Sequence, residues 1–336
     1  MVSLSRRQLG LIALLTSSSA ALAACSSSGS DGAASDAGGS TASTSPTTVT
    51  VEDLRGSVTV PVPATRIVAT DNRLFRTLDE WKIKLVAGPV DLMPDEVSYT
   101  SDSSILNTGN HREPNLEQLV AADPDLVLNG QRYAQYYDQI KALVPNAALV
   151  DTDIDSEKPL KDELIRQITL VGEVLAHDEE AAKLVTAFED AITRVTKAYD
   201  PSKTVMGLIT SGGDINYSAP VTGRGIGPLF PMLGLTPSLQ VDGSTDHTGD
   251  DISVEAIAES NPDWIIVLDR DAAVSADEEG YQPAAELVAG SEALKNVTAV
   301  KDGTIVYMPN NFYLTEDIQV YTEFLNSFAD ALEKNK

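Results

Sequence analysis

The stretch LEQLVAADPDLVLNGQR at residues 116–132 has a partner 138 residues later, VEAIAESNPDWIIVLDR at residues 254–270. Each copy has the pattern of a short helix, a Pro-Asp turn and a buried strand, with an arginine just beyond the strand. The identical pairs are Glu117 with Glu255, Pro124 with Pro262, Asp125 with Asp263, and Arg132 with Arg270. Helix, Pro-Asp and strand form a common connector in α/β proteins, so the shared arginine is the most informative identity. The repeat predicts two halves built on the same plan.

Around the two copies, short β-rich runs alternate with helical patterns such as the one at residues 116–122. The predicted strands are residues 58–60, 66–69, 85–88, 125–128, 148–150, 204–209, 264–268 and 304–308. Strands that alternate with helices indicate parallel sheets, so the predicted fold class is α/β.

The longest predicted helix covers residues 178–199, in the middle of the chain. Its apolar residues recur at spacings of three and four, which places them on one helical face. Acidic residues fill its first turn, where the helix dipole favours negative charge, and Pro201 ends it. Such a helix is about 33 Å long and is able to span the junction between two lobes.

Arg132 and Arg270 each follow a predicted strand. In open parallel sheets, ligands bind beyond the carboxyl ends of the strands. If the two halves face each other, both arginines point into one cleft, and Arg224, in the glycine-rich segment TGRGIG (222–227), is a third candidate. Glycines there would allow the backbone to approach a ligand. A single arginine is often only a surface ion pair, but three predict a cleft that binds a small anion. Helices of βαβ units start at the same edge, so Glu117 and Glu255 are expected near the rim.

Charge and composition exclude several classes of protein. The chain has 24 Lys+Arg against 50 Asp+Glu, a net charge of −26, which argues against a nucleic-acid partner. Signature motifs of hydrolases, metalloproteases and P-loop enzymes are absent, so the chain is not expected to be an enzyme. The three histidines are scattered: no role is expected for His111, and the role of His247 stays open between a solvated loop residue and a ligand. Tyr313 is expected either in the core or at the cleft.

The first 24 residues have the pattern of a signal peptide, with Arg6 and Arg7 followed by a short apolar segment. The run Leu-Ala-Ala-Cys at residues 22–25 predicts a lipoprotein whose Cys25 carries the lipid; the alternative is cleavage elsewhere and a free thiol. Residues 25–48 are small and polar and predict a lipidated N-terminus with a flexible tether, on the outer face of the cytoplasmic membrane. Export by the Sec or by the twin-arginine route fits equally.

With these residues in view, the chain resembles the class III substrate-binding lipoproteins of iron-siderophore ABC transporters, in their catecholate or petrobactin-type branch. The resemblance covers about residues 49–334 and is carried by TRIVATDNRLFRTLDEW, GNHREPNLEQLVAADPDLVLNGQR, ISVEAIAESNPDWIIVLDR and NNFYL. It implies two Rossmann-like lobes with a ligand cleft between them. An N-terminal lobe (49–177) and a C-terminal lobe (201–336) are joined by a long inter-lobe helix (178–200), with little hinge movement.

The resemblance also implies roles for single residues. Arg132, Arg224 and Arg270 would hold a ferric siderophore, and His247 and Tyr313 would fill the two iron positions that a tetradentate siderophore leaves open. Glu117 and Glu255 would dock onto arginines of an ABC permease. The implied protein is a monomer without an intrinsic cofactor, and the ferric siderophore is its transported ligand.

One segment departs from the family pattern. A Gly/Ser-rich stretch normally follows the tyrosine, but here the residues are Thr315, Glu316 and Asp317. The alternatives to a catecholate are haem, a cobalamin-like ligand or a hydroxamate siderophore. A zinc or manganese carrier would usually need several converging histidines, and a lipid-anchored enzyme has no supporting motif.

Overall fold

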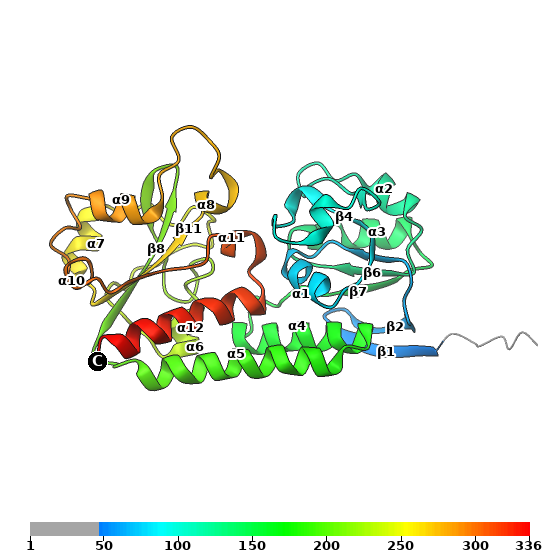
Figure 1. The fold of residues 1–336 in the computed structure, drawn as a ribbon, viewed down its shortest axis with the longest axis horizontal. Helices are drawn as coiled ribbons and strands as arrows, with labels where there is room; N and C mark the ends of the chain where they lie inside the picture. Colours follow the sequence, from blue (N-terminus) through cyan, green and yellow to red (C-terminus); the bar gives the residue numbers. More distant parts are fainter. Residues whose placement is uncertain (1–46) are drawn as a thin grey trace, which may run out of the picture. The chain divides into compact units, whose positions relative to one another are not determined.

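The computed structural model describes residues 47–336 (Figure 1). Its N-terminal lobe is built on a parallel sheet in the order β5-β4-β3-β6-β7. The strands are β3 (Ile67–Ala69), β4 (Leu85–Gly88), β5 (Leu106–Asn107), β6 (Leu126–Asn129) and β7 (Ala148–Asp151). An antiparallel hairpin of β1 (Thr47–Asp53) and β2 (Gly56–Val62) precedes this sheet.

The C-terminal lobe has a second sheet in the order β10-β8-β11-β12, in which these four strands are parallel and β9 pairs antiparallel with β8. The strands are β8 (Thr204–Ser211), β9 (Asp214–Tyr217), β10 (Thr236–Pro237), β11 (Trp264–Asp269) and β12 (Ile305–Tyr307). The predicted α/β class with parallel sheets and two lobes is therefore confirmed.

Helices connect the strands in both lobes. In the N-terminal lobe these are α1 (Phe75–Glu80), α2 (Leu116–Ala121) and α3 (Tyr137–Leu143), with 3₁₀ turns η1 (Asn72–Leu74), η2 (Val90–Leu92), η3 (Ser98–Ser101) and η4 (Gln131–Tyr136). In the C-terminal lobe they are α6 (Leu229–Leu233), α7 (Val254–Ser260), α8 (Asp271–Val274), α9 (Ala284–Gly290), α10 (Thr298–Asp302) and α11 (Phe312–Thr315). None of the helices in the described part of the chain is both long and apolar enough to cross a bilayer.

The internal repeat has the same structure in both lobes, as helix α2 followed by β6 and helix α7 followed by β11. Its aspartates also make equivalent hydrogen bonds. Asp125 accepts hydrogen bonds from the backbone nitrogens of Thr65 and Arg66, and Asp263 accepts one from the backbone nitrogen of Thr204. Burial disfavours ionisation of both carboxyls, but these hydrogen bonds outweigh it and hold the pKa of Asp125 and of Asp263 below its ordinary value. Each aspartate thus ties the strand of its own repeat to the neighbouring strand.

The long helix predicted in the middle of the chain is α5 (Asp178–Ala198), which buries an apolar face that includes Phe188 and Val195. Two further helices, α4 (Leu160–Leu175) and α12 (Ile318–Lys334), pack against it. The apolar residues of α4 enter both cores: Leu164 and Ile168 belong to the core of the C-terminal lobe, and Leu170 and Val171 to that of the N-terminal lobe. Helices α4, α5 and α12 therefore connect the lobes as a packed layer along one side of them (Figure 1).

Candidate functional site

Tyr313 lies at the centre of the three arginines that the sequence singled out. The Cζ atoms of Arg132, Arg224 and Arg270 are 5.4, 4.6 and 5.2 Å from the centre of the Tyr313 ring. The tyrosine comes from α11 and is only 5% exposed. These four residues are called the arginine cluster below. The geometry allows cation–π contacts from each guanidinium and gathers three positive charges within one small volume.

The cluster is formed by both lobes, because Arg132 and Arg270 follow strands of different sheets. Arg132 lies in η4 just after β6, and its Nη2 donates a hydrogen bond of 3.3 Å to the backbone oxygen of Tyr313. Arg270 directly follows β11 and donates from Nη1 to Ser211 Oγ (3.2 Å) and Asp271 Oδ1 (3.1 Å). Both positions fit the expectation that the carboxyl ends of the two sheets face each other.

Two N–H groups of the cluster lack a partner within residues 47–336. The Nε atoms of Arg132 and Arg270 are buried and form no hydrogen bond there. Burial, together with the charge of Arg224, lowers the pKa of Arg132 from its ordinary value. An unpaired buried donor costs free energy, so an anionic acceptor at this place would be stabilised by the existing charges.

The glycines beside Arg224 pack closely within the chain. The backbone nitrogen of Gly227 donates to the oxygen of Gly223 (2.7 Å), and a Cβ on Gly227 would lie 2.5 Å from that backbone. At Gly225, where φ is +71°, a Cβ would press on the ring of Phe312. The segment is therefore a tight turn that presents Arg224, and these glycines allow the close packing within it.

A carboxylate that the sequence marked only as a departure from the family pattern lies next to the cluster. Glu316 Oε1 accepts a hydrogen bond of 2.6 Å from Arg224 Nε. Its Oε2 is 3.5 Å from Arg73 Nη2 and 3.4 Å from Gln131 Nε2, both in the N-terminal lobe. Burial opposes ionisation, but the charges of Arg224 and Arg73 outweigh it and keep the pKa of Glu316 below its ordinary value. Arg73 was not predicted, since nothing in its local sequence distinguishes it from a surface arginine.

His247 stands apart from the contacts that hold the cluster. Its side chain is 47% exposed, and its Nδ1 is 3.8 Å from Asp246 Oδ1, which is the one polar contact of this ring within residues 47–336. Hydrogen bonds from Thr248 lower the pKa of Asp246, and the charges of His247 and Arg270 add to this effect. The loop therefore lies within electrostatic reach of Arg270.

His111, for which no role was expected, lies near the cluster. Burial lowers the pKa of His111, and the positive charges of Arg132, Arg112 and Arg224 lower it further. Its Nδ1 is buried and has no partner in the described chain. The influence of Arg224 crosses from one lobe to the other, so only the folded chain reveals this neighbour. The sequence signal available was its place in the loop that precedes the first repeat.

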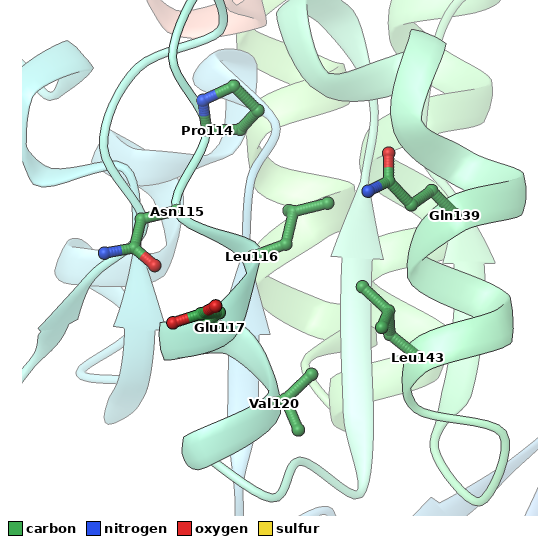
Figure 2. Close-up of a pocket in the computed structure, with 7 residues that line it drawn as sticks. All are labelled: Pro114, Asn115, Leu116, Glu117, Val120, Gln139 and Leu143. Atoms are coloured by element: carbon green, nitrogen blue, oxygen red, sulfur yellow. The ribbon is translucent and has the colours of Figure 1, made fainter.

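Glu117 and Glu255 occupy equivalent places, in the first turns of α2 and α7, and both are exposed. Glu117 lines an open groove of about 700 Å³ between α2 and α3, shown in Figure 2. Exposed apolar side chains of Val120 and Leu143 lie in the same groove. None of the residues that line it belongs to the arginine cluster. Cys25, the predicted lipidation site, lies outside the described residues.

Two α/β lobes that place basic side chains around a shared buried tyrosine are the architecture of a solute-binding protein. The chain belongs to the periplasmic binding protein family, whose model matches residues 67–312. Members of this family are extracytoplasmic, substrate-binding transport proteins. The matched range includes all three arginines of the cluster and ends one residue before Tyr313.

Several curated proteins are similar over most of their length. The petrobactin-binding protein YclQ of Bacillus subtilis is 25% identical over 281 residues, which cover 82% of this chain and 84% of that protein. The ferric-anguibactin-binding protein FatB of Vibrio anguillarum is 24% identical over 272 residues, which cover 80% of this chain and 82% of that protein. The iron(3+)-hydroxamate-binding protein FhuD of Bacillus subtilis is 24% identical over 283 residues, which cover 81% of this chain and 83% of that protein.

Solved structures show the same fold. The crystal structure of YclQ matches with a TM-score of 0.72 at 22% identity and covers 85% of this chain and 99% of that one. The periplasmic catecholate-siderophore binding protein VctP from Vibrio cholerae matches with a TM-score of 0.73 at 22% identity, with 85% and 100% covered.

Proposed function

We propose that this protein captures a ferric siderophore, of the catecholate type, outside the cytoplasm and delivers it to an ABC permease for iron uptake. The observation that carries the proposal is the arginine cluster: three guanidinium groups, from both lobes, surround one buried tyrosine. The relatives named for petrobactin, anguibactin and iron hydroxamate support a ferric complex as the ligand class.

The chemistry of the cluster suits a ferric catecholate. Ferric iron is a hard ion that prefers oxygen donors, and a catecholate surrounds it with negatively charged oxygens. Burying such a complex is costly unless positive groups face it, and the arginines supply these groups. The same charges would repel a bare zinc or manganese ion, which makes a divalent-metal carrier the weaker alternative.

Tyr313 and His247 are proposed as the protein's own iron ligands. A tetradentate siderophore leaves two of six coordination positions open, and a phenolate oxygen with an imidazole nitrogen would fill them. Tyr313 already lies among the arginines. The His247 ring lies beside Asp246 on an exposed loop, and the charge of Arg270 reaches that aspartate.

The remaining parts of the proposal concern delivery. Lipidation at Cys25 would keep the protein at the outer face of the cytoplasmic membrane, with the segment before β1 (Thr47–Asp53) as its tether. Glu117 and Glu255, one exposed carboxylate on each lobe, would meet arginines of the permease. A monomer can present both carboxylates to one transporter.

The test is a titration of the purified protein with the ferric complex of a bis-catecholate, followed by tyrosine and tryptophan fluorescence. We expect a Kd below about 1 μM, which corresponds to roughly −8 kcal/mol. Haem and a ferric hydroxamate serve as competitors. Tight binding of either of these without binding of the catecholate would contradict the assignment.

Absorbance of the same complex tests the two iron ligands. His247→Ala and Tyr313→Phe should each shift the visible band, because each variant removes one donor to iron. His177, which stacks on Trp81 and is not part of the cluster, provides the matched control His177→Ala, which should leave the band unchanged. If the spectra of all three variants match that of the wild type, neither His247 nor Tyr313 ligates iron.

A further inference from the structure

Glu316 places a negative charge in a site that otherwise gathers positive ones. It is 7% exposed, and it follows directly on α11, the helix that carries Tyr313. Its carboxylate is held by Arg224 from one lobe and approached by Arg73 and Gln131 from the other. This contact set makes Glu316 part of the ligand-facing region and not a distant surface acid.

The backbone at Glu316 is in a conformation that favours glycine. Its φ is +46°, in the left-handed region, and its N–H donates to the oxygen of Phe312 to end α11. A side chain in this conformation costs on the order of 1 kcal/mol relative to glycine. The carboxylate is kept ionised at this position, because the charges of Arg224 and Arg73 outweigh its burial and hold its pKa below the ordinary value.

The position of the carboxylate leaves part of Arg224 free for a ligand. Glu316 accepts from Nε of Arg224, and within residues 47–336 the terminal nitrogens of that guanidinium form no hydrogen bond. The Arg224 side chain is 22% exposed, so these nitrogens remain reachable. The carboxylate therefore reduces the net positive charge of the cluster without covering it.

We propose that Glu316 shifts the charge preference of the site toward ferric complexes of low negative charge. The inference rests on the proposed function and narrows its ligand class. A ferric bis-catecholate carries one net negative charge, and a ferric tris-catecholate carries three. A fixed carboxylate within the cluster repels the second complex more strongly than the first, because the repulsion grows with the charge of the ligand.

The test compares Kd values for the ferric complexes of a synthetic bis-catecholamide and a synthetic tris-catecholamide. In Glu316→Gln, affinity for the tris-catecholate should rise relative to the bis-catecholate by about ten-fold, the effect of about 1.4 kcal/mol. Glu316→Gly serves as a second variant that suits the left-handed backbone. Since the two variants differ in side-chain size, a shared shift would identify charge as its cause.

Asp317→Asn is the matched control. Asp317 is an adjacent buried carboxylate that faces Arg76 and caps α12, and asparagine is an equally good cap. This variant should leave the ratio of the two Kd values unchanged. A wild-type ratio in both Glu316 variants, with tight binding preserved, would overturn the charge preference alone. Failure of the wild-type protein to bind either complex would overturn both this inference and the proposed function.

Discussion

Arg224 and Arg270 reach the same tyrosine but are held differently. Arg224 pairs with the buried Glu316, whereas Arg270 donates to Ser211 and Asp271 of its own lobe. In Arg224→Ala or Arg270→Ala, we expect the Kd for a ferric bis-catecholate to rise by about ten-fold or more, since hydrogen bonds to charged groups contribute about 1.5–3 kcal/mol. Fluorescence titration measures the change.

The control for this prediction is Arg194→Ala. Arg194 is a half-buried arginine of α5 that pairs with Asp330 and Glu333 of α12 and makes no contact with the cluster. The Arg194→Ala variant should bind the ferric bis-catecholate as tightly as the wild type. Wild-type affinity in both cluster variants would remove the arginine cluster as the binding site.

Asp71 provides a prediction about pH. Its carboxylate is fully buried in the N-terminal lobe, where it accepts hydrogen bonds from Thr152 and Gln167. Burial raises the pKa of Asp71 from 3.8 to about 6; the charge of Arg73 opposes this shift and that of Asp153 adds to it. The native state therefore binds this proton more tightly than the unfolded chain, so the contribution of Asp71 to stability falls as pH rises from about 4 to about 6.

Asp71→Asn should remove this dependence. Between pH 4 and pH 6.5, the wild type should lose on the order of 2 kcal/mol more unfolding free energy than the variant. Urea denaturation of both proteins at several pH values measures this difference in unfolding free energy. Carboxyls with a lowered pKa, such as Asp125, cause the opposite trend with pH, but they are present in both proteins and cancel in the comparison. Parallel pH profiles for the two proteins would contradict the prediction.

At the scale of elements, the layer of α4, α5 and α12 keeps the lobes together. Phe328 of α12 is fully buried, stacks on Phe324 and meets the ring of Trp264 edge to face at 5.7 Å. Phe328→Ala should reduce the unfolding free energy by about 3–5 kcal/mol, because it leaves a cavity where the helix meets the sheet.

Urea denaturation followed by circular dichroism measures this loss, with Lys334→Ala at the exposed end of the same helix as the control. The control should unfold within about 0.5 kcal/mol of the wild type. If Phe328→Ala is equally stable, α12 does not contribute to the core in the way the structure shows.

At the scale of the whole molecule, the proposed docking role of the two exposed glutamates of the repeat predicts that delivery can be impaired without loss of ligand binding. Glu117→Arg combined with Glu255→Arg should lower uptake of a ferric siderophore by about ten-fold or more, because arginine would face arginine at the permease. Ligand affinity of the purified variant should stay at the wild-type value, since neither residue belongs to the arginine cluster.

Uptake of labelled iron by cells that depend on this protein measures the effect. Glu259→Arg is the control, because Glu259 is an exposed acid on the same helix as Glu255. It should transport normally. Normal uptake by the double variant would exclude these glutamates as docking residues.

Many features of this fold follow from local sequence. The period of apolar residues in α5 and the alternation of strands with helices are properties of neighbouring residues, so they predict the α/β class and most strands. The repeat also carries long-range information, because it places Arg132 and Arg270 beyond the carboxyl ends of two strands that belong to different halves of the chain. The resemblance to siderophore-binding proteins adds the iron-ligand roles of Tyr313 and His247 and a ferric siderophore as the ligand of the arginines.

Other features depend on pairings that no local pattern encodes. Arg73 and Glu316 are far apart in sequence and meet only because the lobes close upon each other, and His111 comes near Arg224 for the same reason. The charge of a site is the sum over all groups that folding brings together, and it is strongly modified by burial. The sequence alone predicts the α/β architecture and the three arginines of the candidate site, because both follow from local patterns and the repeat. Only the tertiary structure shows that Glu316 pairs with Arg224 and that His111 lies near the arginine cluster, because these contacts join residues far apart in the chain.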